Sequence, residues 1–146
     1  MKSEPDVYSI DQLEKDKTTW WGGVRNYQAR NSMKEMKVGD EVLFYHSSTN
    51  PPGVAGIAKI SKTAEPDETQ FDKKSEYYEP KATKEKPIWS CAQVQFVKKF
   101  KTYVSLSDLH ANDKLKDLLV LQKGSRLSIQ PVSPKNFEII KKMGGL

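Results

Sequence analysis

The spacing of apolar positions predicts three helices at well-separated places along the chain. Ser9-Ile10-Asp11-Gln12 fits a capping box, in which the serine hydroxyl accepts from the backbone N–H three residues on, so a short helix is expected over residues 9–15. A second helix is expected over residues 26–36, and a third is expected to follow Ser133 with Pro134 in its first turn. The residues that share one face of the second helix are Ala29, Met33 and Met36.

Two further segments have the pattern of strands. Residues 41–46 carry apolar side chains at consecutive positions, which indicates a strand that is covered on both faces. A second strand is expected over residues 54–62, after the turn at Asn50-Pro51-Pro52-Gly53. Gly56 interrupts this second strand and therefore predicts a bulge or a close approach of two backbones.

The remaining segments complete an α+β pattern. Residues 64–88 contain three prolines and many charges, so they are expected to run over the surface. The other expected elements are strands over 89–100 and 126–132 and helical turns over 106–110 and 114–119. The chain shows no repeat and no linker, and we therefore expect a single domain over residues 1–146, built around a strongly curved sheet.

Composition narrows the environment but not the function. The formal charge of +5 and the pI near 9.2 favour polyanionic partners without specifying one. No stretch reaches the roughly 18–20 apolar residues of a membrane span. The N-terminus lacks the apolar core of a signal peptide, so a cytoplasmic protein is expected, or a nuclear one in a eukaryotic source. The single cysteine, Cys91, is weak support for a reducing compartment.

Residues for catalysis or metal binding are scarce. The two histidines, His46 and His110, belong to no Cys/His cluster, so neither a metal nor a cofactor is expected. The chain has no glycine-rich phosphate loop and no nucleophile elbow. None of its carboxylates stands out as a general acid/base pair, and we therefore expect no catalytic residues and a protein that is not an enzyme.

The densest chemistry lies in residues 20–31. This segment holds two indoles, a phenol, two guanidiniums and three carboxamides. It has two interpretations: aromatic side chains that fill the core at a loop-to-helix junction, or a stacking wall with amides that read the edge of a base. The diglycine Gly22-Gly23 would let the backbone approach a flat ligand closely.

Three weaker patterns have similar alternatives. Residues 44–47 fit either a pocket rim or a core aromatic beside a surface histidine. Arg126, Ser128 and Gln130 alternate along the last expected strand, which suits either a solvated face or an anionic or base-edge ligand. Residues 81–101 carry six lysines against one acid, which indicates a solvated face or a track for a phosphate backbone.

Taken together, these segments resemble the EVE-domain family from end to end and in the same order. The stretches that carry the resemblance are Lys2-Ser3-Glu4-Pro5-Asp6, Trp21 with residues 23–31, residues 44–47 and 53–56, Pro66-Asp67, Tyr78, Pro87 with Trp89, and residues 125–132. The doubled Trp20-Trp21 and Gly22 vary the family's Trp-polar-Gly-Val pattern, which leaves open which indole lines a pocket.

The resemblance implies a PUA-like fold, a small mixed β-barrel flanked by short helices. It also implies a non-catalytic module that binds DNA or RNA and accommodates a modified, flipped-out base such as 5-methylcytosine. The pocket residues that it implies are Lys2, Ser3, Trp21, Asn26, Tyr45, Ser128 and Gln130. Three arginines would face phosphates or brace the pocket, namely Arg25, Arg30 and Arg126.

Two other functions remain open at this point. One is an enzyme, a nuclease or base-removing activity, that acts on modified nucleic acid. The other is a small-molecule or protein-interaction sensor that never meets nucleic acid. The preferred modification, the choice between DNA and RNA or between single and double strands, and the oligomeric state are not specified by the residues.

Overall fold

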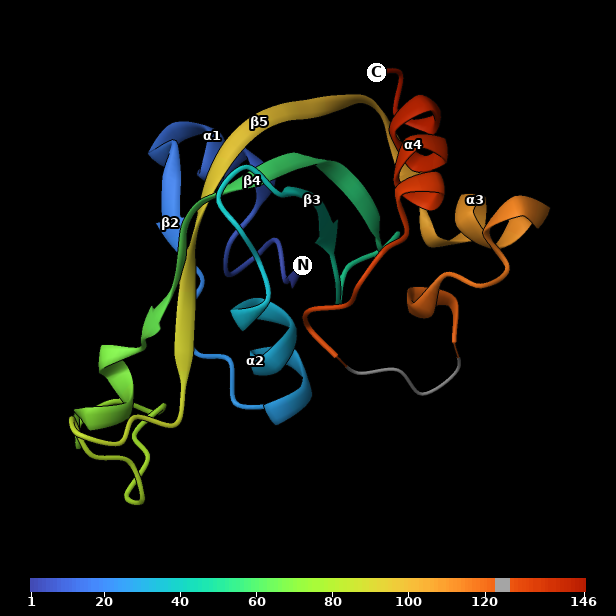
Figure 1. The fold of residues 1–146 in the computed structure, drawn as a ribbon. Coiled ribbons are helices and arrows are strands. Elements are labelled where there is room, and N and C mark those ends of the chain that lie inside the picture. The colour runs from blue at the N-terminus through green and yellow to red at the C-terminus, as the bar shows by residue number, and fades with distance from the viewer. Residues whose placement is uncertain (123–126) are drawn as a thin grey trace.

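A computed structural model describes residues 1–122 and 127–146. Two long antiparallel strands, β4 and β5, form an arch, with α1 and β2 at one end and α3 and α4 at the other (Figure 1). The strands are β1 (Lys2–Ser3), β2 (Thr18–Trp20), β3 (Glu41–His46), β4 (Gly53–Pro66) and β5 (Ser90–Ser105). The helices are α1 (Ile10–Asp16), α2 (Tyr27–Lys34), α3 (Leu106–Ala111) and α4 (Pro134–Met143), with short 3-10 helices η1 (Glu68–Phe71), η2 (Asp113–Leu115) and η3 (Leu119–Leu121).

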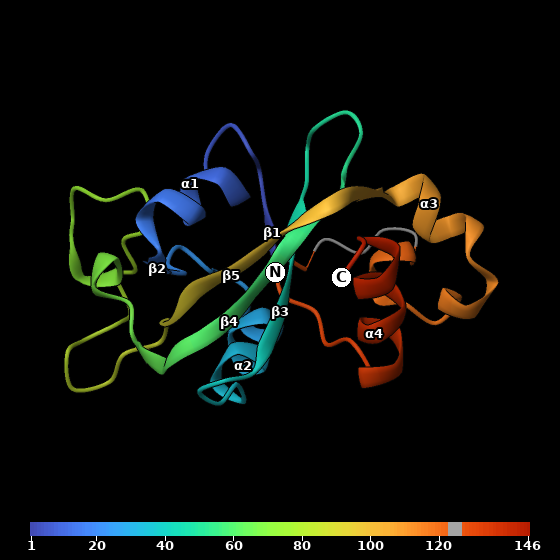
Figure 2. The ribbon, with the colours of Figure 1, turned by 90° about the horizontal axis from the view of Figure 1, so that it is seen from above.

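In the described part of the chain, five strands form one mixed sheet in the order β1-β3-β4-β5-β2. Only the short β1 runs parallel to its neighbour, and it places Lys2 opposite Tyr45 and Ser3 opposite His46. The other neighbours are antiparallel, and β4 lies between β3 and β5, as the view from above shows (Figure 2). The α+β class is therefore confirmed.

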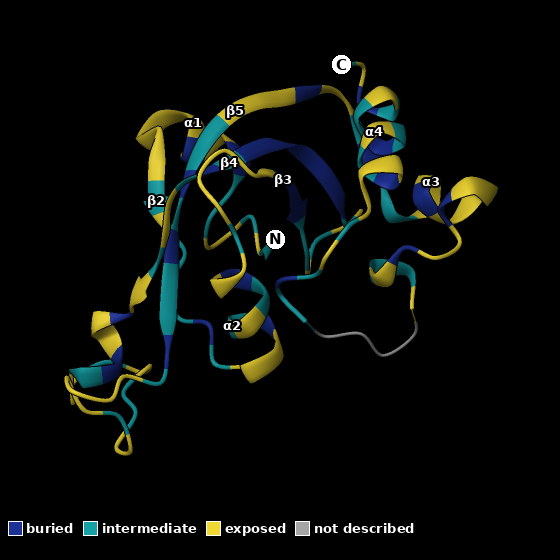
Figure 3. Ribbon diagram, viewed as in Figure 1, coloured by how far each residue is buried: buried dark blue, intermediate teal, exposed yellow. Residues whose placement is uncertain are grey.

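Strand β3 is buried on both faces, as its consecutive apolar residues predict. Val42 and Phe44 pack into one core layer, with residues of α1, α2 and β4. Leu43 and Tyr45 point to the opposite face and pack into a second layer, with residues of α3 and α4. Because side chains alternate along a strand, four buried residues in a row require both faces to be covered. Figure 3 shows the same dark, buried stretch in β4.

Irregular pairing bends the arch. The β4–β5 register shifts at four places, including the step between Val54 and Gly56, and such bulges increase twist and curvature. Gly56 lies where the two strands approach each other closely, since a Cβ atom at this position would be 2.6 Å from the Lys98 carbonyl oxygen. The close approach expected at this glycine is confirmed.

Capping residues define the helix starts as expected. The Ser9 hydroxyl accepts from the Gln12 N–H at 3.1 Å, and Ser133 caps α4 in the same way. The second half of the first capping box is absent, because the Gln12 amide donates to Asp16 at 3.0 Å instead of turning back. The N-terminal cap of α2 is Asn26, whose side-chain oxygen accepts from the Ala29 N–H.

Three expectations differ from the structure. Residues 127–132 form irregular backbone and no strand, and residues 123–126, including Arg126, lie outside the described residues. The surface excursion expected over residues 64–88 begins later, because β4 continues to Pro66 and η1 follows at once. Strand β2 was not expected, since three residues are too few to show an alternating pattern.

Gly56→Ala is expected to lower the free energy of unfolding by about 2–3 kcal/mol, because the added methyl group must push two paired strands apart. Urea denaturation followed by circular dichroism measures this change. Gly39→Ala is the matched control, because its Cβ would meet nothing within 4 Å and only its positive φ of 92° opposes the substitution. That control is expected to cost about 1 kcal/mol. Equal losses in the two variants would contradict the close approach at Gly56.

Candidate functional site

The two end strands of the curved sheet face each other across a cavity of about 410 Å³. Residues of β1 line one side and residues of β2 and the loop after it line the other, while Ser128 closes a third side. We call this space the Trp21 cavity. Its lining residues are Lys2, Ser3, Val7, Tyr8, Thr19, Trp20, Trp21, Gly22, Gly23, Val24, Arg25, Asn26 and Ser128. Five of the seven expected pocket residues are therefore brought together: Lys2, Ser3, Trp21, Asn26 and Ser128.

Both indoles line the cavity, but they differ in how they are held. Trp21 is half-buried and meets the ring of Phe44 edge-on, with ring centroids 5.6 Å apart and an interplanar angle of 87°. This contact anchors Trp21 to the core layer that contains Phe44. Trp20 is 40% exposed, and its ring contacts the ammonium of Lys62, 5.8 Å from the ring centroid. Trp21 is therefore the rigid wall and Trp20 the exposed rim.

Backbone contacts hold the polar side of the cavity. The Lys2 N–H donates to the Ser128 carbonyl at 2.7 Å, which ties β1 to the irregular segment 127–132. The Ser3 hydroxyl donates to the Tyr8 carbonyl at 2.7 Å and fixes the turn that carries Val7. The oxygen of the Asn26 amide caps α2, so its NH₂ group is left to donate to a ligand.

Tyr45 and Gln130 lie elsewhere. They line a separate, smaller cavity of about 40 Å³, which also has Lys2 and Ser128 in its wall. Tyr45 is only 8% exposed, and burial raises the pKa of its hydroxyl. The ammonium of Lys2 lies 5.9 Å from the centroid of the Tyr45 ring. The structure thus places these two expected pocket residues behind β1 and outside the Trp21 cavity.

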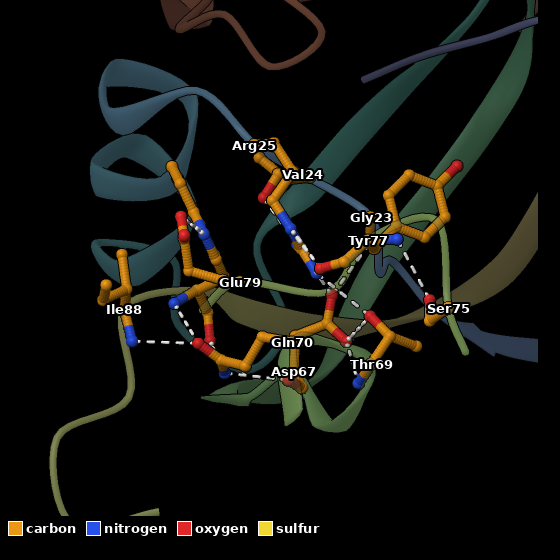
Figure 4. A network of polar contacts seen from close by, with 11 residues as sticks. Gly23, Val24, Arg25, Asp67, Thr69, Gln70, Ser75, Tyr77, Glu79 and Ile88 are labelled. Carbon is orange, nitrogen blue, oxygen red and sulfur yellow. Dashed lines mark hydrogen bonds and ion pairs between the residues drawn. The ribbon is translucent and has the colours of Figure 1, made fainter. Parts of the chain in front are cut away.

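Arg25 holds the loop that follows Trp21. All five N–H bonds of its guanidinium donate within the protein: one to the Val24 carbonyl, two to the Tyr77 carbonyl, one to Asp67 and one to Thr69 (Figure 4). A guanidinium with every donor engaged has none left for a phosphate. Of the two roles expected for Arg25, facing a phosphate or bracing the pocket, this geometry favours bracing.

Asp67 is the acceptor at the centre of this network. The side chain is 3% exposed and accepts from the Gly23 N–H at 2.8 Å, from Arg25 at 3.2 Å, and from the Thr69 N–H and hydroxyl at 3.0 and 2.6 Å. Burial opposes its charge, but the hydrogen bonds from Thr69, Gly23 and Arg25 outweigh that effect and lower its pKa. In the sequence, Asp67 belongs to the Pro66-Asp67 stretch of the family resemblance, and nothing there pairs it with Gly23.

A second layer of contacts supports this network. Gln70 is fully buried, and its amide makes four hydrogen bonds, two donated to the Asp67 and Trp89 carbonyls and two accepted from the Ile88 and Trp89 N–H groups. Arg30 donates to the Ile88 carbonyl at 3.0 Å and lies over the Tyr27 ring, 4.9 Å from its centroid. Arg30 is therefore also engaged within the protein.

The other reactive side chains have structural contacts. The His46 ring accepts from the Ile10 N–H at 3.1 Å and so supports the start of α1. Burial and the nearby carboxylates of Asp67, Glu65 and Glu68 raise the pKa of the Cys91 thiol to about 11. Among residues 1–122 and 127–146, no group of three His, Cys, Asp or Glu side chains is placed to hold a metal ion. No helix in the same residues is long and apolar enough to cross a membrane.

The family model, the sequence relatives and the solved structures that are similar to this chain all match nearly its whole length. The model of the EVE domain family matches residues 1–143. Human thymocyte nuclear protein 1 is 41% identical over a match that covers 96% of this chain and 70% of the relative. A solved structure of a Pseudomonas syringae protein superimposes with a TM-score of 0.94 at 48% identity and covers 99% of this chain and 97% of its own.

A further solved structure contains a ligand. It is human THYN1 in complex with DNA that contains 5-methylcytosine, and it superimposes with a TM-score of 0.92 at 39% identity. The match covers 100% of this chain and 96% of that one.

Asp67→Asn is expected to lower the free energy of unfolding by about 2–4 kcal/mol at neutral pH, because an amide NH₂ would face donors that now meet a carboxylate. The stability that ionised Asp67 contributes is present above the ordinary aspartate pKa of 3.8 and is lost as pH falls through its lowered pKa. As the pH is lowered through the acidic range, the free energy of unfolding of Asp67→Asn is therefore expected to fall less than that of the wild-type protein. Urea titrations of both proteins across the acidic range measure it.

The exposed Asp113→Asn is the control for this substitution, with an expected change within about 0.5 kcal/mol. A loss for Asp67→Asn no greater than this control would show that the network does not hold the loop.

Proposed function

Because the chain belongs to the EVE domain family, we propose that it binds DNA that carries a modified base and holds that base in the Trp21 cavity. The observation that supports this most strongly is the composition of the cavity: a rigid indole, polar groups held by backbone contacts, and a volume suited to one base. A cavity of about 410 Å³ lies within the roughly 300–1,000 Å³ of small-ligand sites. The complex of human THYN1 with 5-methylcytosine-containing DNA makes 5-methylcytosine the first ligand to test.

In the proposed binding mode the base leaves its stack and lies against the Trp21 ring. The Asn26 NH₂ group donates to an acceptor on the base edge, and the Ser3 and Ser128 side chains complete the polar side. The methyl group of a modified cytosine fills space beside apolar surface of the cavity, where each buried methyl contributes roughly 0.8 kcal/mol. Tyr45 and Gln130 support the wall from behind β1 and do not touch the base.

Electrostatic attraction between exposed lysines and the DNA phosphates is expected to supply the rest of the affinity for DNA. Arg25 and Arg30 brace the site, so phosphates are expected to meet exposed lysines instead. A binding series against salt concentration tests this directly, since phosphate contacts require log affinity to fall with log salt. A flat series would favour the alternative of a small-molecule or protein-interaction sensor.

The cavity also supports binding without catalysis. None of its described lining residues is an aspartate, glutamate, histidine or cysteine, and these are the side chains that most often act as a general acid or base. Its remaining ionisable groups are Lys2, Arg25 and the Tyr8 hydroxyl, which donates to Asp16 at 2.8 Å. Incubation with modified oligonucleotides, with and without divalent metal, is expected to leave them intact; strand cleavage or base release would establish the enzyme alternative.

Relatives with the name thymocyte nuclear protein 1 suggest where such a module works. The proposal places this chain in the compartment that holds DNA, which is the nucleus in a eukaryote and the cytoplasm otherwise. RNA with modified bases stays a second candidate ligand, and parallel titrations with RNA and DNA of one sequence distinguish the two.

Trp21→Ala is expected to weaken binding to an oligonucleotide with one 5-methylcytosine at least tenfold, because a stacked base contributes about 1–3 kcal/mol. Fluorescence anisotropy with a labelled oligonucleotide measures the affinity, and near-ultraviolet circular dichroism checks that the fold is kept. Tyr45→Phe is the matched control, since it removes a hydroxyl outside the cavity and is expected to change affinity less than twofold. Unchanged affinity in a folded Trp21→Ala variant would contradict the pocket assignment.

A further inference from the structure

Trp20 and Gly22 also line a second cavity, of about 410 Å³, which we call the Glu65 cavity. The Trp21 cavity and the Glu65 cavity share these two residues as a common wall. The remaining lining comes from the end of β4, from η1 and from the start of β5. Its lining residues are Trp20, Gly22, Glu65, Pro66, Asp67, Glu68, Thr69 and Cys91.

The contacts of Trp20 with the core do not explain why an exposed position carries a large indole side chain. It is 40% exposed and does not pack against the core layer that holds Trp21. Trp20 and Lys62 both lie opposite Gln93 of β5, one from β2 and one from β4, which brings the Lys62 ammonium to 5.8 Å from the indole centroid. An exposed aromatic ring beside an exposed lysine is the combination that binds a stacked base and its phosphate in single-stranded nucleic acid.

The charges of the Glu65 cavity select what enters it. Glu65 and Glu68 are exposed and form no ion pair with another described residue, whereas the Asp67 carboxylate is engaged by Gly23, Arg25 and Thr69. Free carboxylates repel a phosphate and accept hydrogen bonds from an amino group. The cavity therefore suits the edge of a base that carries an exocyclic amino group, while a phosphate belongs outside, near Lys62.

We infer that Trp20 is a second stacking surface, on which the nucleobase next to the modified base lies over the Glu65 cavity. This inference rests on the proposed function, because the first base must occupy the Trp21 cavity. It adds a preference for a single-stranded or locally opened site, since two neighbouring bases leave the stack. It also adds a preference for cytosine, adenine or guanine over thymine beside the modified base, because thymine lacks an exocyclic amino group.

The test uses a single-stranded DNA of eleven nucleotides with a central 5-methylcytosine, and a second copy in which both neighbouring nucleotides are abasic. The protein is expected to bind the intact strand about tenfold more tightly than the abasic-flanked strand, as measured by fluorescence anisotropy. Trp20→Ala is expected to lose that difference, and Trp20→Phe to keep it, because a phenyl ring still stacks. Val38→Ala, which shortens another exposed apolar side chain, is expected to leave both affinities unchanged.

A chemical readout checks the site independently. Cys91 is the only cysteine and lines the Glu65 cavity, so its alkylation by iodoacetamide reports on access to that cavity. The intact strand is expected to slow alkylation at least threefold, and the abasic-flanked strand to slow it less than twofold.

The outcomes separate the two proposals. Failure of the protein to bind either strand, and also the duplex that each forms with its complement, would overturn the proposed function, and the inference with it. Binding of the duplexes alone would overturn the inference alone. If the protein binds the intact strand but Trp20→Ala lowers the affinity for both strands equally, the inference alone is overturned. The same holds if Trp20→Ala lowers neither affinity. Equal alkylation rates with the two strands would also overturn the inference alone.

Discussion

The buried carboxylate of Asp67 is the contact on which the candidate site depends most. It accepts from the Gly23 backbone and from Arg25, and so joins the end of β4 to the loop that follows Trp21. Because Gly23 has a φ of 76° and a Cβ there would lie 2.9 Å from the Tyr77 ring, the loop can take this path only with a glycine. Two segments 44 residues apart in the sequence thereby set the position of one indole.

The candidate site also depends on the curvature of the sheet. Bulges bend β4 and β5 until the two end strands, β1 and β2, line one cavity from opposite sides. The site is thus the seam of an incomplete barrel, where edge strands leave backbone and side-chain groups available to a ligand. Burial of β3 on both faces keeps the arch rigid, since helices cover both core layers.

Much of this architecture was predictable from the residues. Caps at Ser9 and Ser133 and the consecutive apolar residues of β3 have strong local signals, and the structure contains the elements that they predict. Strands β1 and β2 are too short for any periodicity, and their partners lie far along the chain. The alternation near Ser128 and Gln130 resembles a strand, but among the described residues this segment is held by a backbone bond from Lys2 to Ser128 and by the Gln130 side chain, which donates to the Leu127 carbonyl.

The candidate site was predictable only in part, for the same reason. The resemblance indicated Lys2, Ser3, Trp21, Asn26 and Ser128, which share a cavity, but also Tyr45, which alternation along β3 directs to the other face. Asp67 and Gln70 have roles that depend on long-range contacts, and no local pattern reveals them.

The central claim is that the Trp21 cavity distinguishes a modified base from an ordinary one. Calorimetric titration of the protein with two DNA strands that differ by a single cytosine methyl group tests it most directly. The methylated strand is expected to bind about fourfold more tightly, because one buried methyl group contributes roughly 0.8 kcal/mol. Equal affinity for the two strands would contradict it.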